Sequence, residues 1–123
     1  GQGYSDFRYR PFTLEGNFAA AAGVQEMLLQ SYSGTIRVFP AIPAGWRDVS
    51  FRGLRAEGAF VVSAERKDGL LQFVEIVAEA GGRLRLENPH PLRIDSEPRA
   101  MTTDGSDVIL EMSPGQKVAF SRR

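Results

Sequence analysis

The hydrophobic and polar positions of this chain follow two different periodicities, one before Gly34 and one after it. Residues Phe18–Gln30 contain no proline and carry apolar side chains around most of a helical circumference, so they predict an α-helix. Asn17 suits the N-cap position, and Gly34 stands where a glycine commonly ends a helix. Only three side chains of this helix are clearly polar: Gln25, Glu26 and Gln30.

After Gly34 the pattern changes to short alternating segments separated by glycine and proline. Leu71–Ala80 is the longest expected strand, and Asp68-Gly69 before it predicts a tight hairpin because it supplies positive φ angles. We expect a second hairpin at Gly81-Gly82. The other expected strands are Thr35–Phe39, Val49–Leu54, Ala59–Arg66, Arg83–Glu87, Leu92–Ile94, Val108–Glu111 and Lys117–Phe120. The predicted fold is mainly β: an antiparallel β-sandwich with one N-terminal α-helix.

The expected helix needs more protein around it than this chain offers. A helix that is apolar on nearly all sides is normally buried, and the sequence predicts no second helix to cover it. Its four consecutive alanines, Ala19–Ala22, would let neighbouring helices approach closely. We therefore expect the chain to be a piece of a larger protein. On its own, the Ala19–Leu29 surface should be covered by self-association or by the N-terminal segment Tyr4–Phe12.

Composition narrows the class of partner. The chain has 123 residues, enough for an independent core, and its 15 Lys and Arg residues balance 15 Asp and Glu residues. The net charge is therefore zero, which gives the chain no electrostatic preference for nucleic acid or a membrane surface. No apolar stretch reaches the ~20 residues that span a bilayer. The absence of cysteine excludes disulfides and thiolate metal sites. We expect neither a nucleic-acid nor a membrane partner.

Few residues of this chain could bind a metal or a cofactor. His90, the one histidine, lies between two prolines with no second metal-binding side chain beside it, so we expect packing in a turn. The acidic residues that follow lack the spacing of a calcium loop: Asp95, Glu97, Asp104 and Asp107. A glycine motif for phosphate is also absent. We predict no metal and no cofactor.

Three aromatic residues could form a platform for a sugar ring: Tyr32, Phe51 and Trp46. The alternative is ordinary packing. Trp46 ends a proline-rich loop between the helix and the expected sandwich, where a large side chain would pin one part to the other. We favour packing over sugar binding for these residues.

Three stretches in unbroken order resemble the C-terminal end of the α-L-fucosidases of glycoside hydrolase family 95. They are PFTLEGNFAAAAGVQEMLLQSYSG at 11–34, TIRVFPAIPAGW at 35–46 and FRGLRAEGAFVVSAERKDGLL at 51–71. The resemblance implies a parent protein with a catalytic (α/α)6 barrel and a β-rich C-terminal domain packed against it. Residues 1–34 would be the end of the barrel, with Phe18–Gln30 as its last helix, and residues 35–123 the β domain. It also suggests a secreted or periplasmic parent.

The resemblance implies that Glu15 is the candidate catalytic residue of the intact parent. The family has an aspartate before Gly-Asn-Phe that is taken to help activate water in an inverting hydrolysis, and Glu15 occupies that place. A carboxylate just ahead of a helix stays ionised, as a general base must. Glu15 is one methylene longer than the aspartate, and Tyr9 replaces the family's upstream histidine. A helix-start carboxylate without catalytic duty is therefore the alternative.

Two functions follow from the sequence. The first is the C-terminal portion of a fucosidase-like glycoside hydrolase, whose β domain supports the catalytic barrel of the same polypeptide while the parent acts on a carbohydrate. The general acid would come from the barrel, so we expect residues 1–123 alone to be inactive. The second is a non-catalytic carbohydrate-binding or interaction module. The sequence upstream of Gly1 discriminates them, because the first requires a helical barrel there.

Overall fold

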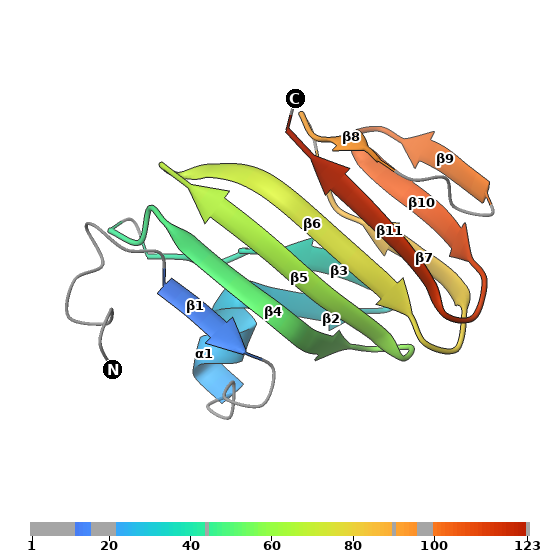
Figure 1. The fold of residues 1–123 in the computed structure, drawn as a ribbon, viewed down its shortest axis with the longest axis horizontal. Coiled ribbons are helices and arrows are strands. Elements are labelled where there is room, and N and C mark those ends of the chain that lie inside the picture. The colour runs from blue at the N-terminus through green and yellow to red at the C-terminus, as the bar shows by residue number, and fades with distance from the viewer. Residues whose placement is uncertain (1–11, 16–21, 44, 90, 96–99, 123) are drawn as a thin grey trace.

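The computed structural model describes residues 12–15, 22–43, 45–89, 91–95 and 100–122. Two β-sheets lie one behind the other in this part of the chain (Figure 1). Sheet A, in front, has the strand order β1 (Phe12–Glu15), β4 (Val49–Ala56), β5 (Phe60–Lys67), β6 (Leu70–Ala78), β11 (Gln116–Ser121) and β8 (Arg93–Ile94). Sheet B, behind it, has the order β2 (Leu29–Tyr32), β3 (Thr35–Val38), β7 (Gly82–Leu86), β10 (Asp107–Met112) and β9 (Ala100–Asp104). The helix α1 (Ala22–Leu28) leads directly into β2.

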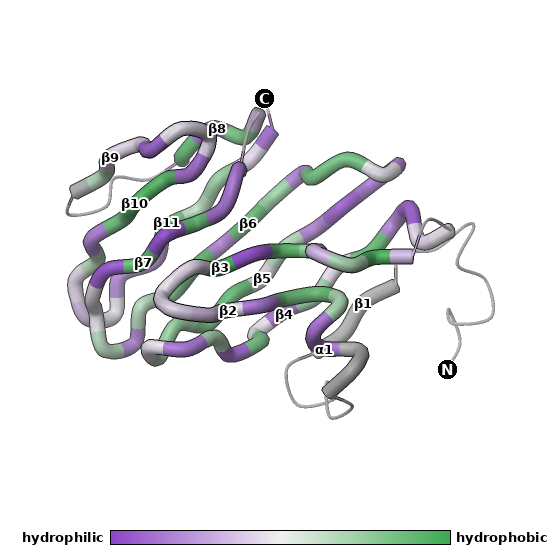
Figure 2. The backbone as a smooth tube through the Cα atoms, turned by 180° about the vertical axis from the view of Figure 1, so that it is seen from behind, coloured by the Kyte–Doolittle hydropathy of each residue, from purple (hydrophilic) through white to green (hydrophobic). Residues whose placement is uncertain are grey.

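An apolar core fills the space between the sheets. Along β6, Val74, Ile76 and Ala78 are buried while the residues between them are partly exposed, and β10 alternates in the same way (Figure 2). The rings of Phe39 and Phe51 meet edge to face with centroids 5.4 Å apart. No polar or charged residue of the described part is buried. The hydrophobic effect therefore holds the two sheets together without buried charge.

The predicted mainly β sandwich with one N-terminal helix is confirmed. Each strand expected from the alternation is present, with ends within two residues of the prediction. Asp68 and Gly69 both have positive φ, 53° and 75°, and join β5 to β6 in the expected hairpin. Strands β1, β2 and β9 were not expected. Two pairings, β1 with β4 and β3 with β7, are parallel, whereas the remaining described pairings are antiparallel.

The hairpin predicted at Gly81-Gly82 is wrong. Strand β6 belongs to sheet A and β7 to sheet B, so the chain crosses between sheets at this point. The crossing from β10 back to β11 packs against it, and the N–H of Gly115 donates to the carbonyl of Ala78 at 2.6 Å. A Cβ on Gly81 would lie 2.8 Å from the backbone nitrogen of Pro114. Glycine is therefore needed here by close approach as well as by its φ of 73°.

The helix ends earlier than the predicted Phe18–Gln30. Leu29–Tyr32 forms strand β2, which pairs with β3, and Ser33 and Gly34 form the turn between them with positive φ. The apolar run at the end of the helix fits either periodicity, and the pairing with β3 decides in favour of a strand. No helix of the described residues is long and apolar enough to span a bilayer.

The surface expected to associate, Ala19–Leu29, is covered in part by the chain itself. Leu28 and Leu29 are buried in the core of the sandwich. The N–H of Phe39 donates to the carbonyl of Leu28 at 2.7 Å, which fixes the end of α1 to the segment after β3. The suggested cover Tyr4–Phe12 lies almost entirely outside the described residues, and self-association stays a prediction.

Candidate functional site

Glu15, the predicted catalytic residue, is the last residue of β1. This strand pairs in parallel with the first half of β4, and the register sets Thr13 opposite Ser50 and Glu15 opposite Arg52. Tyr9, which stands in place of the family histidine, lies outside the described residues, as does the stretch between Glu15 and α1. The backbone of Glu15 is thus part of sheet A, and not the first turn of a described helix.

Beside Glu15, strand β4 carries a bulge. Phe51 pairs with Ala64 and Leu54 with Val62, so one extra residue is inserted between them on β4. Gly53 accommodates the insertion with a φ of 69°, and its N–H donates to the hydroxyl of Ser63 at 3.0 Å. The insertion lets both Phe51 and Leu54 point into the core, while Arg52 between them is exposed.

A shallow depression lies on the outer face of sheet A next to the bulge. It encloses about 60 Å³ and is lined by Ser50, Phe51, Arg52, Ser63, Ala64, Glu65 and Phe73. That volume holds roughly two water molecules and is far below the roughly 300–1,000 Å³ of ligand pockets. The depression can therefore hold solvent, but it is not a sugar-binding active site by itself.

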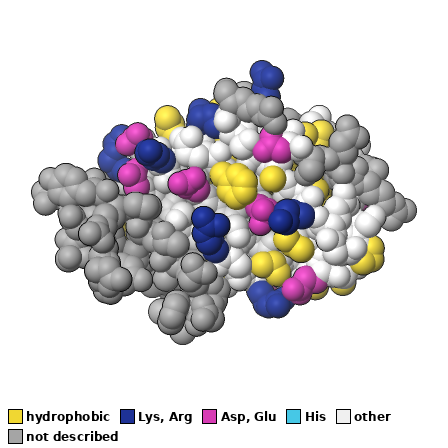
Figure 3. Space-filling model, viewed as in Figure 1, with side chains coloured by type: hydrophobic (Ala, Val, Ile, Leu, Met, Phe, Trp, Pro, Cys, Tyr) yellow, Lys and Arg dark blue, Asp and Glu magenta, His cyan; other side chains and the backbone are white. Residues whose placement is uncertain are grey.

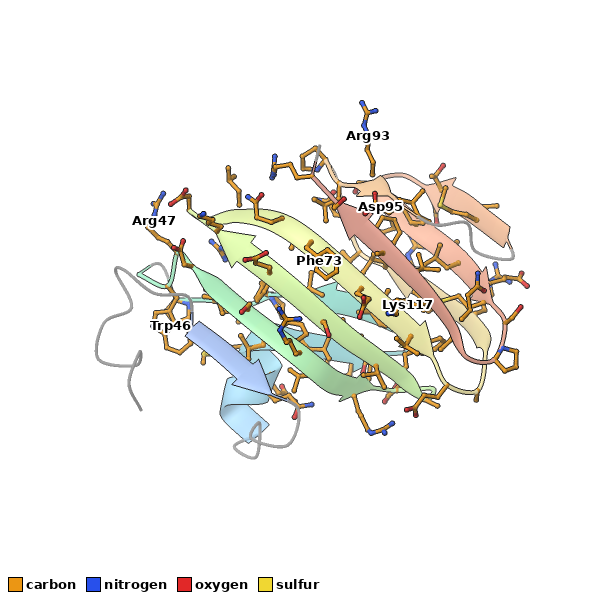
Figure 4. All side chains as sticks on the ribbon, viewed as in Figure 1. Trp46, Arg47, Phe73, Arg93, Asp95 and Lys117 are labelled. Carbon is orange, nitrogen blue, oxygen red and sulfur yellow. The ribbon has the colours of Figure 1, made fainter. Side chains whose placement is uncertain are left out.

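The outer face around this depression mixes one aromatic ring with charges of both signs. Phe73 lies near the middle of the face, and Lys117 lies on the neighbouring part of it (Figure 4). Lys117 Nζ is 3.8 Å from the Glu75 carboxylate, and Figure 3 shows acidic and basic groups on several sides of the hydrophobic patch. The sequence analysis missed this face. Its signal was the hairpin at Asp68-Gly69, which sets Glu65 opposite Phe73.

Two carboxyl groups are held ionised by arginine. Arg55 donates to both oxygens of Glu79 at 2.7 and 3.3 Å, and this lowers the pKa of Glu79. Arg85 Nε donates to Asp107 at 2.7 Å, which lowers the pKa of Asp107, and the N–H of Asn88 adds to the effect. A general acid for glycoside hydrolysis must be protonated near neutral pH. Neither carboxyl group meets that requirement.

The acidic residues considered for metal binding form ion pairs and hydrogen bonds instead. Arg85 contacts Asp104 at 2.8 Å and Asp107 at 2.7 Å, which links β7 to the β9–β10 hairpin. Asp95 accepts a hydrogen bond from the Ser121 hydroxyl at 2.6 Å. Within the described ranges, no group of three or more metal-binding side chains is arranged to hold an ion. Glu97 and His90 fall outside those ranges.

The three aromatic residues do not form a platform. Phe51 is buried, Trp46 is partly buried against the core, and Tyr32 is half exposed. Figure 4 places Trp46 beside β1 and the start of β4, at the end of the proline-rich loop. Packing is therefore the role of Phe51 and Trp46, whereas Tyr32 is left open to solvent.

Comparison with known proteins agrees with the resemblance in the sequence. Residues 30–120 match the family described as glycoside hydrolase family 95, C-terminal domain. The chain is also 42% identical over 65 residues to alpha-L-fucosidase 2 of Arabidopsis thaliana. That similarity covers 51% of this chain but only 8% of the plant protein, so the chain spans a small part of that relative's length. Because the family match covers well over half of it, the chain belongs to the C-terminal domains of glycoside hydrolase family 95.

Proposed function

We propose that this member of the glycoside hydrolase family 95 C-terminal domains fastens the end of a catalytic barrel and holds Glu15 in position within an intact parent enzyme. The parent would hydrolyse α-L-fucosides or closely related sugars with inversion. The support for this substrate class is the similarity to a plant alpha-L-fucosidase 2. The β domain would act on no substrate alone.

The observation that carries the proposal is how the chain enters the sandwich. Strand β1, which ends at Glu15, pairs with β4 of sheet A, and α1 runs directly into β2 of sheet B. The polypeptide before the sandwich is therefore anchored to both sheets. Backbone pairing holds β1 in one register on β4, and a catalytic group must be held within about 0.5 Å of its productive position.

The boundary between the two parts belongs at the end of α1. The sequence suggested a division into residues 1–34 and 35–123. Strand β2 already contributes to sheet B, Leu29 is buried in the core, and the family match begins at residue 30. We therefore propose that the C-terminal domain begins no later than Leu29, and that the end of the barrel is fastened to it through β1 and Leu28.

In the intact parent, Glu15 would act as the general base. An ionised carboxylate accepts a proton from water, and the resulting hydroxide attacks the anomeric carbon from the face opposite the leaving group. A protonated carboxylic acid about 6.5–9.5 Å away must protonate the leaving oxygen. That acid would come from the barrel. For this reason we expect no glycosidase activity from residues 1–123.

The test is a set of substitutions in the full-length parent. Glu15→Gln removes the base and should lower kcat by about 10²–10⁴-fold with little change in KM. Glu15→Asp restores the family's aspartate and should retain or raise kcat. The matched control is Glu111→Gln, which removes a partly exposed carboxylate on β10 of sheet B, outside the candidate site, and should keep wild-type rates. Wild-type kcat for Glu15→Gln would reduce Glu15 to a structural carboxylate.

The supporting role has its own test, which does not involve Glu15. A parent protein that ends at Leu28 lacks both sheets, so it should lose thermal stability and activity together. A truncated parent that keeps its melting temperature and kcat would contradict the proposed support.

A further inference from the structure

A groove lies where α1, β2 and the end of β4 meet. It has a volume of about 380 Å³, within the roughly 300–1,000 Å³ of ligand pockets. Among the described residues, β1 pairs with Val49–Arg52 and no strand pairs with β4 beyond Arg52 on that side, so the later part of β4 is an edge of the described sheet A. Figure 2 shows α1, β2 and β4 side by side from behind, and the Ser31 hydroxyl accepts a hydrogen bond from the N–H of Glu57 at 2.9 Å.

The groove has an apolar floor and one exposed aromatic wall. Leu29 is 4% exposed and belongs to the core, whereas Tyr32 is 50% exposed. Tyr32 is one of only three large hydrophobic residues of the described chain that are this open to solvent, together with Leu70 and Met101. Neither of the other two lines the groove. An exposed tyrosine presents a flat apolar ring with a hydroxyl group at its end, which suits a ligand that has both an apolar face and polar groups.

Polar groups around Tyr32 are held in place by hydrogen bonds. The Tyr32 hydroxyl lies 3.5 Å from Glu26 Oε1, and Gln30 Nε2 donates to the backbone carbonyl of Glu26 at 3.2 Å. Arg55 is fixed by its two hydrogen bonds to Glu79. The backbone of Glu57 is fixed by Ser31. These contacts reduce the conformational entropy that the side chains would lose when a ligand binds.

The mixture of groups favours a neutral ligand with many hydroxyl groups. Glu26 and Glu57 are acceptors and would repel an anion. The Arg55 guanidinium only donates and would repel a cation, whereas the side-chain amides of Gln25 and Gln30 can both donate and accept. A hydroxyl group both donates and accepts, so it can use both kinds of partner. The C–H face of a sugar ring is apolar and stacks on an aromatic ring.

We propose that this groove binds one neutral sugar unit, with its ring against Tyr32 and its hydroxyl groups on Glu26, Arg55 and Glu57. The site does not include Glu15, and the residues that line it lie between Gln25 and Glu57. Binding by residues 1–123 without hydrolysis is therefore the expected behaviour, and the failure of this proposal would leave the proposed function untouched.

The experiment is a titration of isotope-labelled chain, followed by amide chemical shifts, with L-fucose and D-galactose as neutral probes. D-Glucuronate serves as the anionic probe and n-butylamine as the cationic one. Saturable shifts confined to residues 25–32 and 55–57, with a neutral sugar as the best ligand, are expected. No saturable binding of either neutral sugar overturns the proposal. A stronger response to glucuronate or butylamine, or shifts centred elsewhere, also overturns it.

Single substitutions in residues 1–123 test whether Tyr32 contacts the sugar. Tyr32→Ala should weaken binding by about tenfold because it removes the stacking face, whereas Tyr32→Phe keeps the face and should stay within about threefold. Met101→Ala removes another exposed apolar side chain, on β9, and should not change the affinity. Because Tyr32 is half exposed, its loss should leave the fold intact, as the unchanged amide spectrum of the remaining strands would verify. Equal affinities for Tyr32→Ala and Met101→Ala would contradict the proposed site.

Discussion

The sandwich and the segment that precedes it differ in how they are stabilised. In the sandwich, buried side chains alternate along β5, β6 and β10, and residues with positive φ join the strands. In the segment before the sandwich, α1 has seven residues and β1 has four. The four residues of β1 pair with β4 of sheet A. A helix of that length is marginal without tertiary contacts. The sandwich therefore carries its own stability, and the preceding segment depends on what it packs against.

The largest effect should come from the core of the sandwich. Phe51 is 1% exposed and meets Phe39 edge to face, so Phe51→Ala should cost about 3–5 kcal/mol of unfolding free energy. Leu70→Ala, at a position that is 54% exposed, is the matched control and should change stability by less than about 0.5 kcal/mol. Urea denaturation measures both. Equal losses for the two variants would mean that the sheets are not held by this core.

Removal of residues 1–21, which include β1 but not α1, should cost less unfolding free energy than the loss of Phe51. A chain that begins at Ala22 lacks the four-residue edge strand β1, but it keeps Leu28 and the other core residues of the described part. We expect one cooperative unfolding transition with a smaller loss of stability than Phe51→Ala causes. A broad, non-cooperative transition would show that the sandwich needs the segment, and the comparison would fail.

A smaller loss of stability should come from substitution of Gly81, where the chain crosses from sheet A to sheet B. Gly81→Ala combines strain at a φ of 73° with close approach to Pro114 and Met112. Gly115→Ala has a similar φ of 79° but nothing within 4 Å of the added Cβ. We expect Gly81→Ala to cost more than about 1 kcal/mol and Gly115→Ala to cost about 1 kcal/mol. Thermal unfolding of both variants separates the cost of steric contact with Pro114 and Met112 from the cost of the positive φ angle. Equal losses of stability for the two variants would show that the crossing tolerates a Cβ at Gly81.

The smallest effect should be the acid dependence at the β7–β10–β9 end of sheet B. The hydrogen bond from Arg85 lowers the pKa of Asp107. The contribution of Asp107 to the free energy of unfolding is therefore complete above its pKa in the unfolded chain, about 3.9. This contribution is lost as the pH falls through the lower pKa of Asp107 in the folded protein. Asp107→Asn lacks this contribution, so the stability difference from wild type should shrink from pH 5 to pH 2. A constant difference would exclude Asp107 as the source.

The sandwich was largely predictable, because burial on one face enforces alternation. Leu71–Ala80 was expected as a strand, and its alternate residues Val74, Ile76 and Ala78 are buried on β6. Pairing partners could not be predicted, since alternation does not reveal which sheet a strand joins. This is why Gly81-Gly82 was mistaken for a hairpin. Strand β9 was missed because Ala100–Asp104 is mostly polar and lies at a sheet edge.

The candidate site was predictable only in part. The role of Glu15 came from the resemblance to the family and stays a prediction, although β1 adds that its backbone lies beside β4. Packing was favoured for Tyr32, Phe51 and Trp46; Phe51 is buried but Tyr32 is half exposed, because residue type alone does not reveal burial. The groove at Tyr32 joins residues from α1, β2 and β4, and no local pattern in the sequence brings these elements together.

Hydrogen exchange of backbone amides, resolved by peptide, tests the central comparison most directly when residues 1–123 and the intact parent are measured together. Amides of β5 and β6 should be protected equally in both proteins, because the sandwich supplies their environment. Amides of α1 should gain protection only in the parent, where the barrel would surround the helix. Equal protection of α1 in both proteins, or loss of protection in β5 and β6 outside the parent, would contradict the account.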